Sequence, residues 1–505
     1  MAMSAEEKVG GFSAPMRPKS GAAGSARDDT ITAWARSDKG EQRSATINVR
    51  VKTGNYRNDA IMLGLSDLKK LKTERPLIFS RGKGIFIYDE NGKDYIESVS
   101  CFYCVSLGFS EERLVEAAVR QMRELPMYSS AIQRTVPIVM DLTDRITKLS
   151  PLKNPRIYFS TTGSEANDYL IKFMWYGNGF NDEPDRRKII SRRASYHGST
   201  IATCALGGSE DLHRSFGIPM GFSVQVSHPS WPNSALPGET EDQFTDRLAE
   251  ELDEAIIAAG PETVGAMIAE PVSVSSGMFP PPGSYFPKIT KVLRKYGIQL
   301  FIDEVVTGFG RSGHMWATEA MGLEPDCVTC AKGISSAYMP IAGIIMGEEF
   351  NRRIDLGNEA KGWFAHGATH HAHVVSAAVA VEVLNIFEER DILGHVRRVM
   401  PRWNRMLNGL LDHPLVKGNR TWGLAGALDL AYPGEERAGA AGSLRVGGIS
   451  KAVYEAGLEK GVIVRPLAGC VVMAPPLIIT EAEIDELGRR LRAALDLTLA
   501  ERPKG

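Results

Sequence analysis

The chain has 505 residues, 43% of them hydrophobic, and a formal net charge of −2. That length and apolar content can support a large buried core shared by at least two lobes. Because positive and negative charges nearly cancel, the composition gives no basic field that would gather nucleic acid or anionic lipid. Neither is therefore expected as a partner.

Membrane and export signals do not stand out in the sequence. No run approaches the roughly 18 consecutive apolar residues that a membrane-spanning helix needs. The N-terminal region has no apolar signal core, and acidic residues at positions 6, 7, 28 and 29 set it apart from the acid-poor composition of a transit peptide. We therefore expect a cytoplasmic protein without membrane association.

The first part of the chain has little periodicity. Residues 1–55 are rich in Ala, Gly, Ser and mixed charge, which predicts an arm that is loose unless it packs on something, with Trp34 as its anchor. Strand-like runs then follow between residues 77 and 96, with a turn at Asn91-Gly92. We interpret residues 56–105 as a small β meander that forms the N-terminal part of a smaller domain.

From residue 106 to 374, helical periodicity alternates with short apolar runs, which predicts a large α/β domain with a mostly parallel central sheet. The runs are residues 156–160, 188–191, 264–269, 299–302, 327–331 and 341–345. Residues 375–505 have long helical patterns around two short β runs. We interpret them as an α+β lobe that packs with the meander, so that the smaller domain is built from both chain ends.

Polar motifs follow the first five apolar runs. In order, these motifs are Thr-Thr-Gly-Ser-Glu-Ala-Asn, Tyr-His-Gly, Glu-Pro, Asp-Glu and Lys-Gly. Ligands of open α/β sheets bind outside the carboxyl ends of the strands. Five segments that are distant in sequence are therefore expected to converge on one site.

Two patterns raise the question of a metal or redox site. Cys101/Cys104 and Cys327/Cys330 have CxxC spacing, but each pair sits in an apolar run, and residues i and i+3 of a strand point to opposite faces. Buried packing is the favoured interpretation. The His-rich segment 366–373 contains no carboxylate or thiolate and leads into an Ala/Val-rich helix, so no metal is predicted there.

Three of the convergent motifs suit pyridoxal phosphate (PLP). Gly163 and Ser164 stand between a strand and a helix, where backbone NH groups and the positive helix end favour a phosphate, although a plain helix N-cap explains the segment equally well. Asp303 ends an apolar strand, and a buried carboxylate needs a partner such as a protonated pyridine nitrogen. Lys332 also follows a strand, where desolvation favours the neutral, nucleophilic amine that reacts with an aldehyde.

The chain resembles the class III (ω-amino acid or amine:pyruvate) aminotransferases, which have PLP fold type I. The resemblance extends from about Leu77 to the C-terminus. It depends on six motifs in the family's order: residues 160–167, Tyr-His-Gly-Ser at 196–199, Glu-Pro-Val at 270–272, Asp-Glu-Val-Val-Thr-Gly-Phe-Gly-Arg at 303–311, Ala-Lys-Gly-Ile at 331–334 and Pro-Pro-Leu at 475–477.

The resemblance implies a role for each matching residue. Lys332 looks like the lysine that binds PLP covalently, and Asp303 like the partner of the pyridine nitrogen. The other implied cofactor contacts are Tyr196 stacked on the ring, Val305 on its opposite face, His197 in the Tyr-His-Gly motif, Gly163 and Ser164 at the phosphate, and Glu270 near the substrate-facing side. In relatives the counterpart of Thr369 reaches across from the neighbouring subunit, which implies a homodimer with shared sites.

Two further positions concern the substrate. Tyr103 matches an aromatic wall of the family, and Arg465 matches an arginine that binds carboxylates through its planar fork, with an ordinary surface charge as the alternative. Some positions depart from the family. Ser273 stands where many 2-oxoglutarate-using relatives have Gln, which weakens the case for a glutamate donor. His370 and His371 replace the common Tyr-Ser after Thr369, and Ala337 replaces a common Gly near Lys332.

The implied reaction is transamination from a primary amine or ω-amino acid to a keto acid, with pyruvate as the expected acceptor. Lys332 would act as the base for the donor's α-proton, Asp303 would keep the ring nitrogen protonated, and Arg465 would hold the keto acid. A racemase, mutase or decarboxylase on the same scaffold is the alternative. A PLP-sensing regulator is disfavoured because residues 1–55 have no helix-turn-helix pattern.

Overall fold

The computed structural model describes residues 30–36, 42–48, 60–436 and 447–502. The chain divides into two units, Met1–Ile78 and Phe79–Gly505. Within the described residues, every helix is too short or too polar to span a bilayer.

The first unit contains a two-stranded hairpin. Strands β1 (Thr30–Arg36) and β2 (Gln42–Asn48) pair antiparallel, from Thr30 opposite Asn48 to Arg36 opposite Gln42. A short 3-10 turn, η2 (Lys70–Lys72), follows. The predicted arm therefore includes regular structure. Trp34 lies on β1, but the anchoring contact predicted for it, like residues 1–29, lies outside the described residues.

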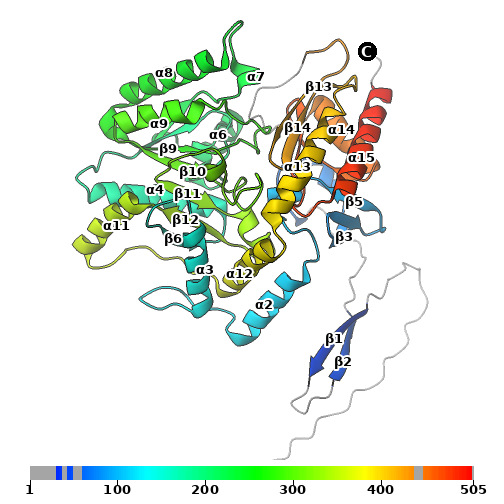
Figure 1. The fold of residues 1–505 in the computed structure, drawn as a ribbon, viewed down its shortest axis with the longest axis horizontal. Helices are drawn as coiled ribbons and strands as arrows, with labels where there is room; N and C mark the ends of the chain where they lie inside the picture. Colours follow the sequence, from blue (N-terminus) through cyan, green and yellow to red (C-terminus); the bar gives the residue numbers. More distant parts are fainter. Residues whose placement is uncertain (1–29, 37–41, 49–59, 437–446, 503–505) are drawn as a thin grey trace, which may run out of the picture. The chain divides into compact units, whose positions relative to one another are not determined.

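The second unit is organised around a seven-stranded sheet (Figure 1). In spatial order the strands are β6 (Arg156–Ser160), β12 (Ala342–Met346), β11 (Cys327–Cys330), β10 (Gln299–Asp303), β9 (Val264–Ala269), β7 (Lys188–Arg192) and β8 (Ser223–Val226). All of them run parallel except β12, which is antiparallel to both of its neighbours. The prediction of a mostly parallel α/β sheet is confirmed.

Two details of this sheet differ from the expectation. Strand β12 was expected among the parallel strands, but only residues 331–341 separate it from β11. That connection is too short for the crossover helix that usually joins parallel neighbours, so the chain reverses instead. Strand β8 was not predicted. It lies at an edge of the sheet, and its short Ser-Val-Gln-Val sequence is only partly buried.

Alternate residues of the central strands enter two apolar cores, one on each face of the sheet. Ile190 and Leu300 pack into the core that also contains residues of α8 (Glu241–Ala259) and α9 (Tyr285–Lys295). Ile189 and Phe301 pack into the core shared with α4 (Gly163–Gly179) and α11 (Glu348–Lys361). Figure 1 shows these helix pairs on opposite sides of the sheet. Coverage of both faces explains why every residue of β9, β10 and β11 is buried and why most of them are apolar.

Further helices complete this part of the chain, and the last of them, α12 (Val374–Glu389), packs against α2 (Glu112–Glu124) and α3 (Pro137–Leu149). The remaining helices of the large-sheet region are α1 (Ser100–Tyr103), α2 (Glu112–Glu124), α3 (Pro137–Leu149), α5 (Ile201–Leu206), α6 (Glu210–Phe216), α7 (Trp231–Ser234), η3 (Pro261–Thr263), α10 (Ala317–Ala320), η4 (Lys332–Ser335) and α12 (Val374–Glu389). The C-terminal region adds α13 (Ile392–Asn408), α14 (Gly448–Glu459) and α15 (Glu481–Ala500).

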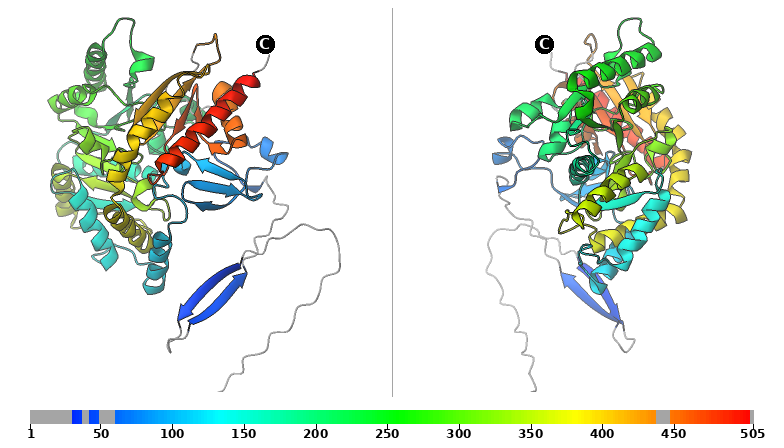
Figure 2. Two further views of the ribbon diagram at one scale, coloured as in Figure 1. Left: turned by 45° about the vertical axis from the view of Figure 1, so that its right-hand side comes forward. Right: turned by 90° about the vertical axis from the view of Figure 1, so that its left-hand side faces the viewer.

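Two smaller sheets join distant parts of the sequence. One has the order β15 (Val462–Ile463), β5 (Asp94–Glu97), β4 (Phe86–Asp89) and β3 (Phe79–Lys83), and the other has the order β13 (Val416–Trp422), β14 (Ala425–Leu430), β17 (Cys470–Met473) and β16 (Arg465–Leu467). Strand β15 pairs parallel with β5, so that Val462 lies opposite Ile96. Figure 2 shows the blue strands β3 to β5 beside the red helix α15. The exact domain boundaries stay a prediction.

Candidate active site

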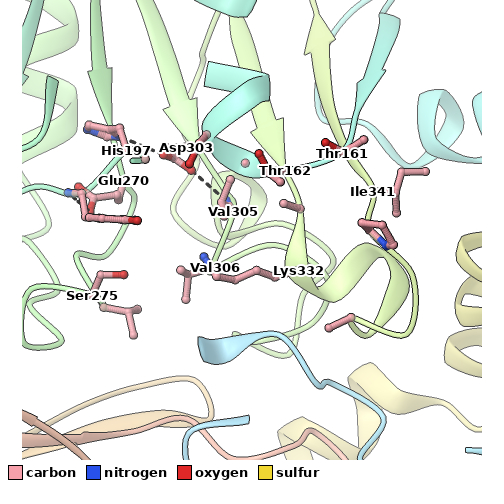
Figure 3. Close-up of a pocket in the computed structure, with 18 of the residues that line it drawn as sticks. Thr161, Thr162, His197, Glu270, Ser275, Asp303, Val305, Val306, Lys332 and Ile341 are labelled. Atoms are coloured by element: carbon pink, nitrogen blue, oxygen red, sulfur yellow. Dashed lines mark hydrogen bonds and ion pairs between the residues drawn. The ribbon is translucent and has the colours of Figure 1, made fainter. Parts of the chain in front are cut away.

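A cavity of about 370 Å³ lies at the carboxyl ends of the central strands (Figure 3). Its lining comes from the segments that follow β6, β7, β9, β10 and β11, which are the five segments that the sequence predicted to converge. Among the lining residues are Thr161, Gly163, Ser164, Tyr196, His197, Glu270, Asp303, Val305 and Lys332. Eight of the predicted site residues therefore meet in one place.

The segment between β6 and α4 has the form of an anion cradle. Thr162 is the N-cap of α4, and its side chain accepts a hydrogen bond from the backbone N of Glu165 at 3.1 Å. Gly163 begins the helix, where a Cβ atom would lie 2.9 Å from Val305 Cγ2. The first amides of a helix have no partner inside it, and the helix end is positive. The N-cap and phosphate interpretations of this segment are thus compatible.

Asp303 is a buried carboxylate, only 4% exposed, at the end of β10. Its Oδ2 atom accepts hydrogen bonds from Asn167 Nδ2 and His197 Nδ1, both at 2.9 Å, and its Oδ1 atom accepts one from the Val305 backbone N at 3.0 Å. Asn167 also donates to the His197 carbonyl at 2.8 Å. These three donors hold the anion rigidly, and a carboxylate can accept one more hydrogen bond.

Lys332 is the basic group of the cavity. It lies two residues after Cys330, the last residue of β11, with a left-handed backbone (φ +48°), a conformation that is costly for a residue other than glycine and is often found at functional sites. In Figure 3 its side chain extends into the space beneath Val305 and Asp303. Burial lowers the pKa of Lys332, against the opposing effect of the Asp303 charge. Among the described residues the amine has no hydrogen-bond or ion-pair partner, so it is available for a ligand.

Glu270 is held by an arginine that the sequence did not identify. Arg192, 1% exposed at the end of β7, donates from Nη2 to Glu270 Oε2 at 2.8 Å and to the Glu270 carbonyl at 2.7 Å. The other carboxylate oxygen of Glu270 accepts from the Tyr196 backbone N at 3.2 Å. A buried charge needs such a partner. Arg192 therefore positions Glu270, and through it the backbone of Tyr196.

Ser273 belongs to the same buried network and does not line the cavity. Its hydroxyl contacts Arg192 Nη2 at 3.3 Å and His228 Nε2 at 2.8 Å. Burial and the Arg192 charge lower the pKa of His228 well below its usual value. The departure from the family at Ser273 thus lies behind Glu270, whose Oε2 atom accepts a hydrogen bond from the Ser273 hydroxyl at 3.3 Å.

Tyr103 and Arg465 lie next to the cavity and are not among its lining residues. Tyr103 is buried in an apolar cluster together with Val272, Val274 and Val306, which do line the cavity. Burial raises the pKa of Tyr103 to about 12, against the opposing charge of Arg465. The half-buried Arg465, on β16, has its Cζ atom 5.0 Å from the centre of the Phe102 ring. No carboxylate among the described residues pairs with Arg465.

The segment that carries Tyr103 has an unusual backbone. Ser100, Cys101 and Tyr103 all have positive φ angles, of 49°, 60° and 65°. Because the segment forms a tight turn rather than a strand, Cys101 is exposed and Cys104 only partly buried, so the expectation of buried packing was wrong for Cys101. It holds for Cys327 and Cys330, which are buried in β11.

Glu97 anchors this turn. Its buried carboxylate accepts hydrogen bonds from the backbone N of Cys101 and, at 3.4 Å, from that of Val99. Burial raises the pKa of Glu97 to about 7, against the opposing effect of these two amides. The turn beside Tyr103 thus depends on a carboxyl group that titrates near neutral pH.

The pH dependence of stability should reveal this carboxyl group. Because the pKa of about 7 in the folded state exceeds the ordinary value of 4.5, the stability that Glu97 contributes is full below pH 4.5 and is lost as the pH rises through 7. The difference between these two pKa values corresponds to about 3 kcal/mol. In denaturant unfolding, Glu97→Gln should therefore gain up to about 3 kcal/mol relative to wild type between pH 5 and pH 8. Glu116→Gln, at an exposed glutamate of α2, is the control and should show no such trend; equal trends in both variants would contradict the role of Glu97.

The cavity fits pyridoxal phosphate. Its volume of about 370 Å³ is within the roughly 300–1,000 Å³ of ligand pockets. The N-terminal end of α4 offers amides to a phosphate, the held carboxylate of Asp303 offers an acceptor to a protonated ring nitrogen, and Lys332 offers a free amine to an aldehyde. Thr369 is exposed and takes no part in the cavity of its own chain.

Comparison with known proteins agrees with this assembly of groups. The sequence model of the family described as Aminotransferase class-III matches residues 69–495. The mitochondrial gamma-aminobutyrate transaminase 1 of Oryza sativa subsp. japonica is 38% identical over 413 residues, covering 82% of this chain and 80% of the relative. The chloroplastic gamma aminobutyrate transaminase 3 of Solanum lycopersicum is 38% identical over 422 residues, covering 82% and 79%.

Solved structures show the same similarity. The omega transaminase from Pseudomonas jessenii in complex with PMP has a TM-score of 0.84 and 35% identity, covering 89% of this chain and 99% of that chain. The PMP-bound aminotransferase from Vibrio fluvialis has a TM-score of 0.82 and 31% identity, covering 87% and 97%.

Proposed function

The chain belongs to the class III aminotransferases and is a PLP-dependent enzyme of fold type I, and from that premise we propose that it transfers an amino group from a primary amine or ω-amino acid to pyruvate. The observation that carries the proposal is that Lys332 and Asp303 line one cavity together with the first residues of α4. Relatives named gamma-aminobutyrate transaminases support an ω-amino acid donor, since γ-aminobutyrate carries its amine at the end opposite to its carboxylate.

We propose the following residues for the cofactor. Lys332 binds the aldehyde carbon covalently, and Asp303, fixed by His197, faces the ring nitrogen. Gly163 and Ser164 hold the phosphate, Tyr196 and Val305 enclose the ring, and Glu270 lies towards the substrate. When bound, pyridoxal phosphate supplies an aldehyde that condenses with amines and a cationic ring that accepts the electron pair left by proton loss.

The chain's own residues then handle protons and charge. The lowered pKa of Lys332 increases the fraction of neutral amine, which is the form that attacks a carbonyl carbon and accepts a proton. Lys332 Nζ would be the base that takes up the α-proton of a bound donor and holds it for return. Asp303, held in place by three donors, would offer its carboxylate to the protonated ring nitrogen of the cofactor.

Substrate recognition is assigned to the neighbourhood of Tyr103 and Arg465. Tyr103 forms an apolar wall continuous with Val272 and Val306. Arg465, without a carboxylate partner among the described residues, binds the carboxylate of the keto acid through a bidentate pair. Its positive charge also contributes to the lowered pKa of Lys332, which supports a position of Arg465 near the reacting amine.

We also propose a homodimer in which Thr369 reaches the phosphate of the neighbouring site. Two observations support it: Thr369 is exposed, and it is not among the residues that line the cavity of its own chain. The cytoplasmic location expected from the sequence likewise remains a proposal.

Spectroscopy of the PLP-loaded protein tests the function. A panel of primary amines, ω-amino acids and α-amino acids should bleach the yellow enzyme selectively, and pyruvate should restore the colour of the bleached form. Turnover should require a keto acid. An enzyme that turns over an amino acid without any keto acid would point to a racemase, mutase or decarboxylase instead.

Arg465→Ala in the same assay separates the two half-reactions. Loss of a charge-assisted pair, about 1.5–3 kcal/mol, should raise the KM for pyruvate by about 10- to 100-fold. Amines without a carboxylate should be nearly unaffected. Arg465→Lys keeps the charge without the planar fork, so its KM for pyruvate should lie between those of wild type and Arg465→Ala. Equal losses for pyruvate and for simple amines would remove the proposed role of Arg465.

A further inference from the structure

The segment from Phe364 to His373, here called the Thr369 segment, connects α11 to α12 and departs from the family at His370 and His371. It follows the outer edge of the seven-stranded sheet, because His371 contacts β6, which is an edge strand paired only with β12.

His371 makes two specific contacts with β6. Its Nδ1 atom lies 2.8 Å from the carbonyl oxygen of Phe159, and its ring stacks on Tyr158 with 3.9 Å between centroids and 18° between planes. A carbonyl can only accept, so Nδ1 carries the proton and donates. An edge strand leaves such carbonyls without a ladder partner. His371 thus takes the place of a missing neighbouring strand at this position.

His366 fixes the other side of Thr369 to α4. Its ring packs edge-on against Tyr169 at 4.5 Å and Phe173 at 4.9 Å, and its Nδ1 accepts a hydrogen bond from Lys172 at 3.0 Å. Thr369 lies between the two histidines. His371 is attached to β6, whereas His366 contacts α4 and also packs on Tyr158 of β6, with 5.1 Å between ring centroids.

These two elements frame the anion cradle. The cradle, residues 161–164, begins where β6 ends at Ser160 and includes the first residues of α4. Phe159 is therefore two residues before the cradle of its own site, while His371 is two residues after Thr369. The hydrogen bond between them connects the part of the chain that binds one phosphate to the part assigned to the phosphate of the neighbouring site.

We infer that His371 is a positioning residue for cofactor retention: its hydrogen bond to Phe159 holds the Thr369 segment against β6 so that Thr369 is presented to the neighbouring subunit. This inference depends on the proposed homodimer. Within the part of the chain that the structure describes, Thr369 itself makes one hydrogen bond, in which its carbonyl accepts from Ser129 Oγ at 3.4 Å. The position of Thr369 therefore depends on its flanking residues.

Dissociation of PLP from the holoenzyme tests the inference. His371→Phe keeps an aromatic ring on Tyr158 and removes the donor, and PLP should dissociate about 3- to 10-fold more readily, the range for one lost hydrogen bond. His371→Asn places an amide NH₂ where Nδ1 was and should retain PLP nearly as well as wild type. If His371→Asn loses PLP as readily as His371→Phe, the hydrogen bond is not responsible and the inference is wrong.

A double-mutant cycle asks whether His371 acts through Thr369. Thr369→Ala should also weaken PLP retention, and adding His371→Phe to it should cause less than about a twofold further change, because coupled residues are non-additive. Effects that multiply would contradict the inference.

His395 provides the matched control. Its Nε2 contacts the Ile479 carbonyl at 2.9 Å, the same kind of bond, in the C-terminal region. His395→Phe should lower the melting temperature without changing PLP retention, and an equal loss of PLP from this variant would show that His371 has only a structural role. Wild-type protein that stays colourless with PLP would overturn the proposed function itself. If His371→Phe retains PLP as well as wild type does, only this inference is overturned.

Discussion

Lys332→Ala should bind pyridoxal phosphate and fail to turn over. Lys332 is the one lysine in the cavity lining, and among the described residues nothing else there offers a neutral amine at the end of a buried strand. Loss of the proton transfer alone corresponds to about 10²- to 10⁴-fold in rate. Loss of the covalent bond to the cofactor should lower the rate further. Without that bond, a donor amine would have to condense directly with the aldehyde, which is slower than displacing the lysine amine from it.

The decisive measurement is steady-state turnover of a donor and pyruvate, alongside the absorbance of the bound cofactor. Lys332→Arg is the matched control, since it keeps the length and positive charge but has no neutral amine. Both variants should be inactive if the amine acts chemically. Retained multiple turnovers in either variant would contradict the assignment of Lys332.

Asp303→Asn should have the second-largest effect on the reaction. The substitution keeps the shape of the side chain and removes the negative charge, so the ring nitrogen loses its anionic partner. Removal of one preorganised group at a reacting centre costs about 10²- to 10³-fold in kcat. The new amide would also meet donors from Asn167, His197 and Val305, which should lower the stability by about 1–3 kcal/mol.

Asn167→Ala distinguishes the effect of the Asp303 charge from the effect of the Asp303 position. It removes one of the three donors to Asp303 and leaves the carboxylate in place, so it should reduce kcat less than Asp303→Asn does. Melting temperatures of both variants would account for any loss of folded protein. If Asp303→Asn kept wild-type kcat, the carboxylate would not be the partner of the ring nitrogen.

The convergence of the site was predictable because parallel strands place their carboxyl ends together. Buried strands such as β9 and β10 appear in the sequence as apolar runs, and the polar residues after them stand out. Asp303, Glu270 and Lys332 were found for that reason. Strand β12 was also predicted, but its direction depends on the short connection from β11, which an apolar run does not reveal.

Residues that hold the cavity-lining side chains in place, without lining the cavity themselves, were not predictable in the same way. Arg192 looks like one of many arginines in the sequence, and only the fold shows that it is buried against Glu270. Asn167 is part of a recognised motif, yet its bond to Asp303 joins residues 136 positions apart. His371 appeared unusual in the sequence, but its bond to the edge of the sheet depends on how the segment before α12 folds back.

The pairing of β15 with β5 has a consequence for folding during translation. Val462 lies beside Ile96, so the strand that completes this small sheet leaves the ribosome hundreds of residues after the strand it joins. Until then, β5 presents an unpaired edge, which is a surface prone to wrong partners during synthesis. Contacts this distant in sequence also form slowly. Truncation before residue 462 should therefore release chains with an open sheet edge, and aggregation of such chains during translation is the expected result.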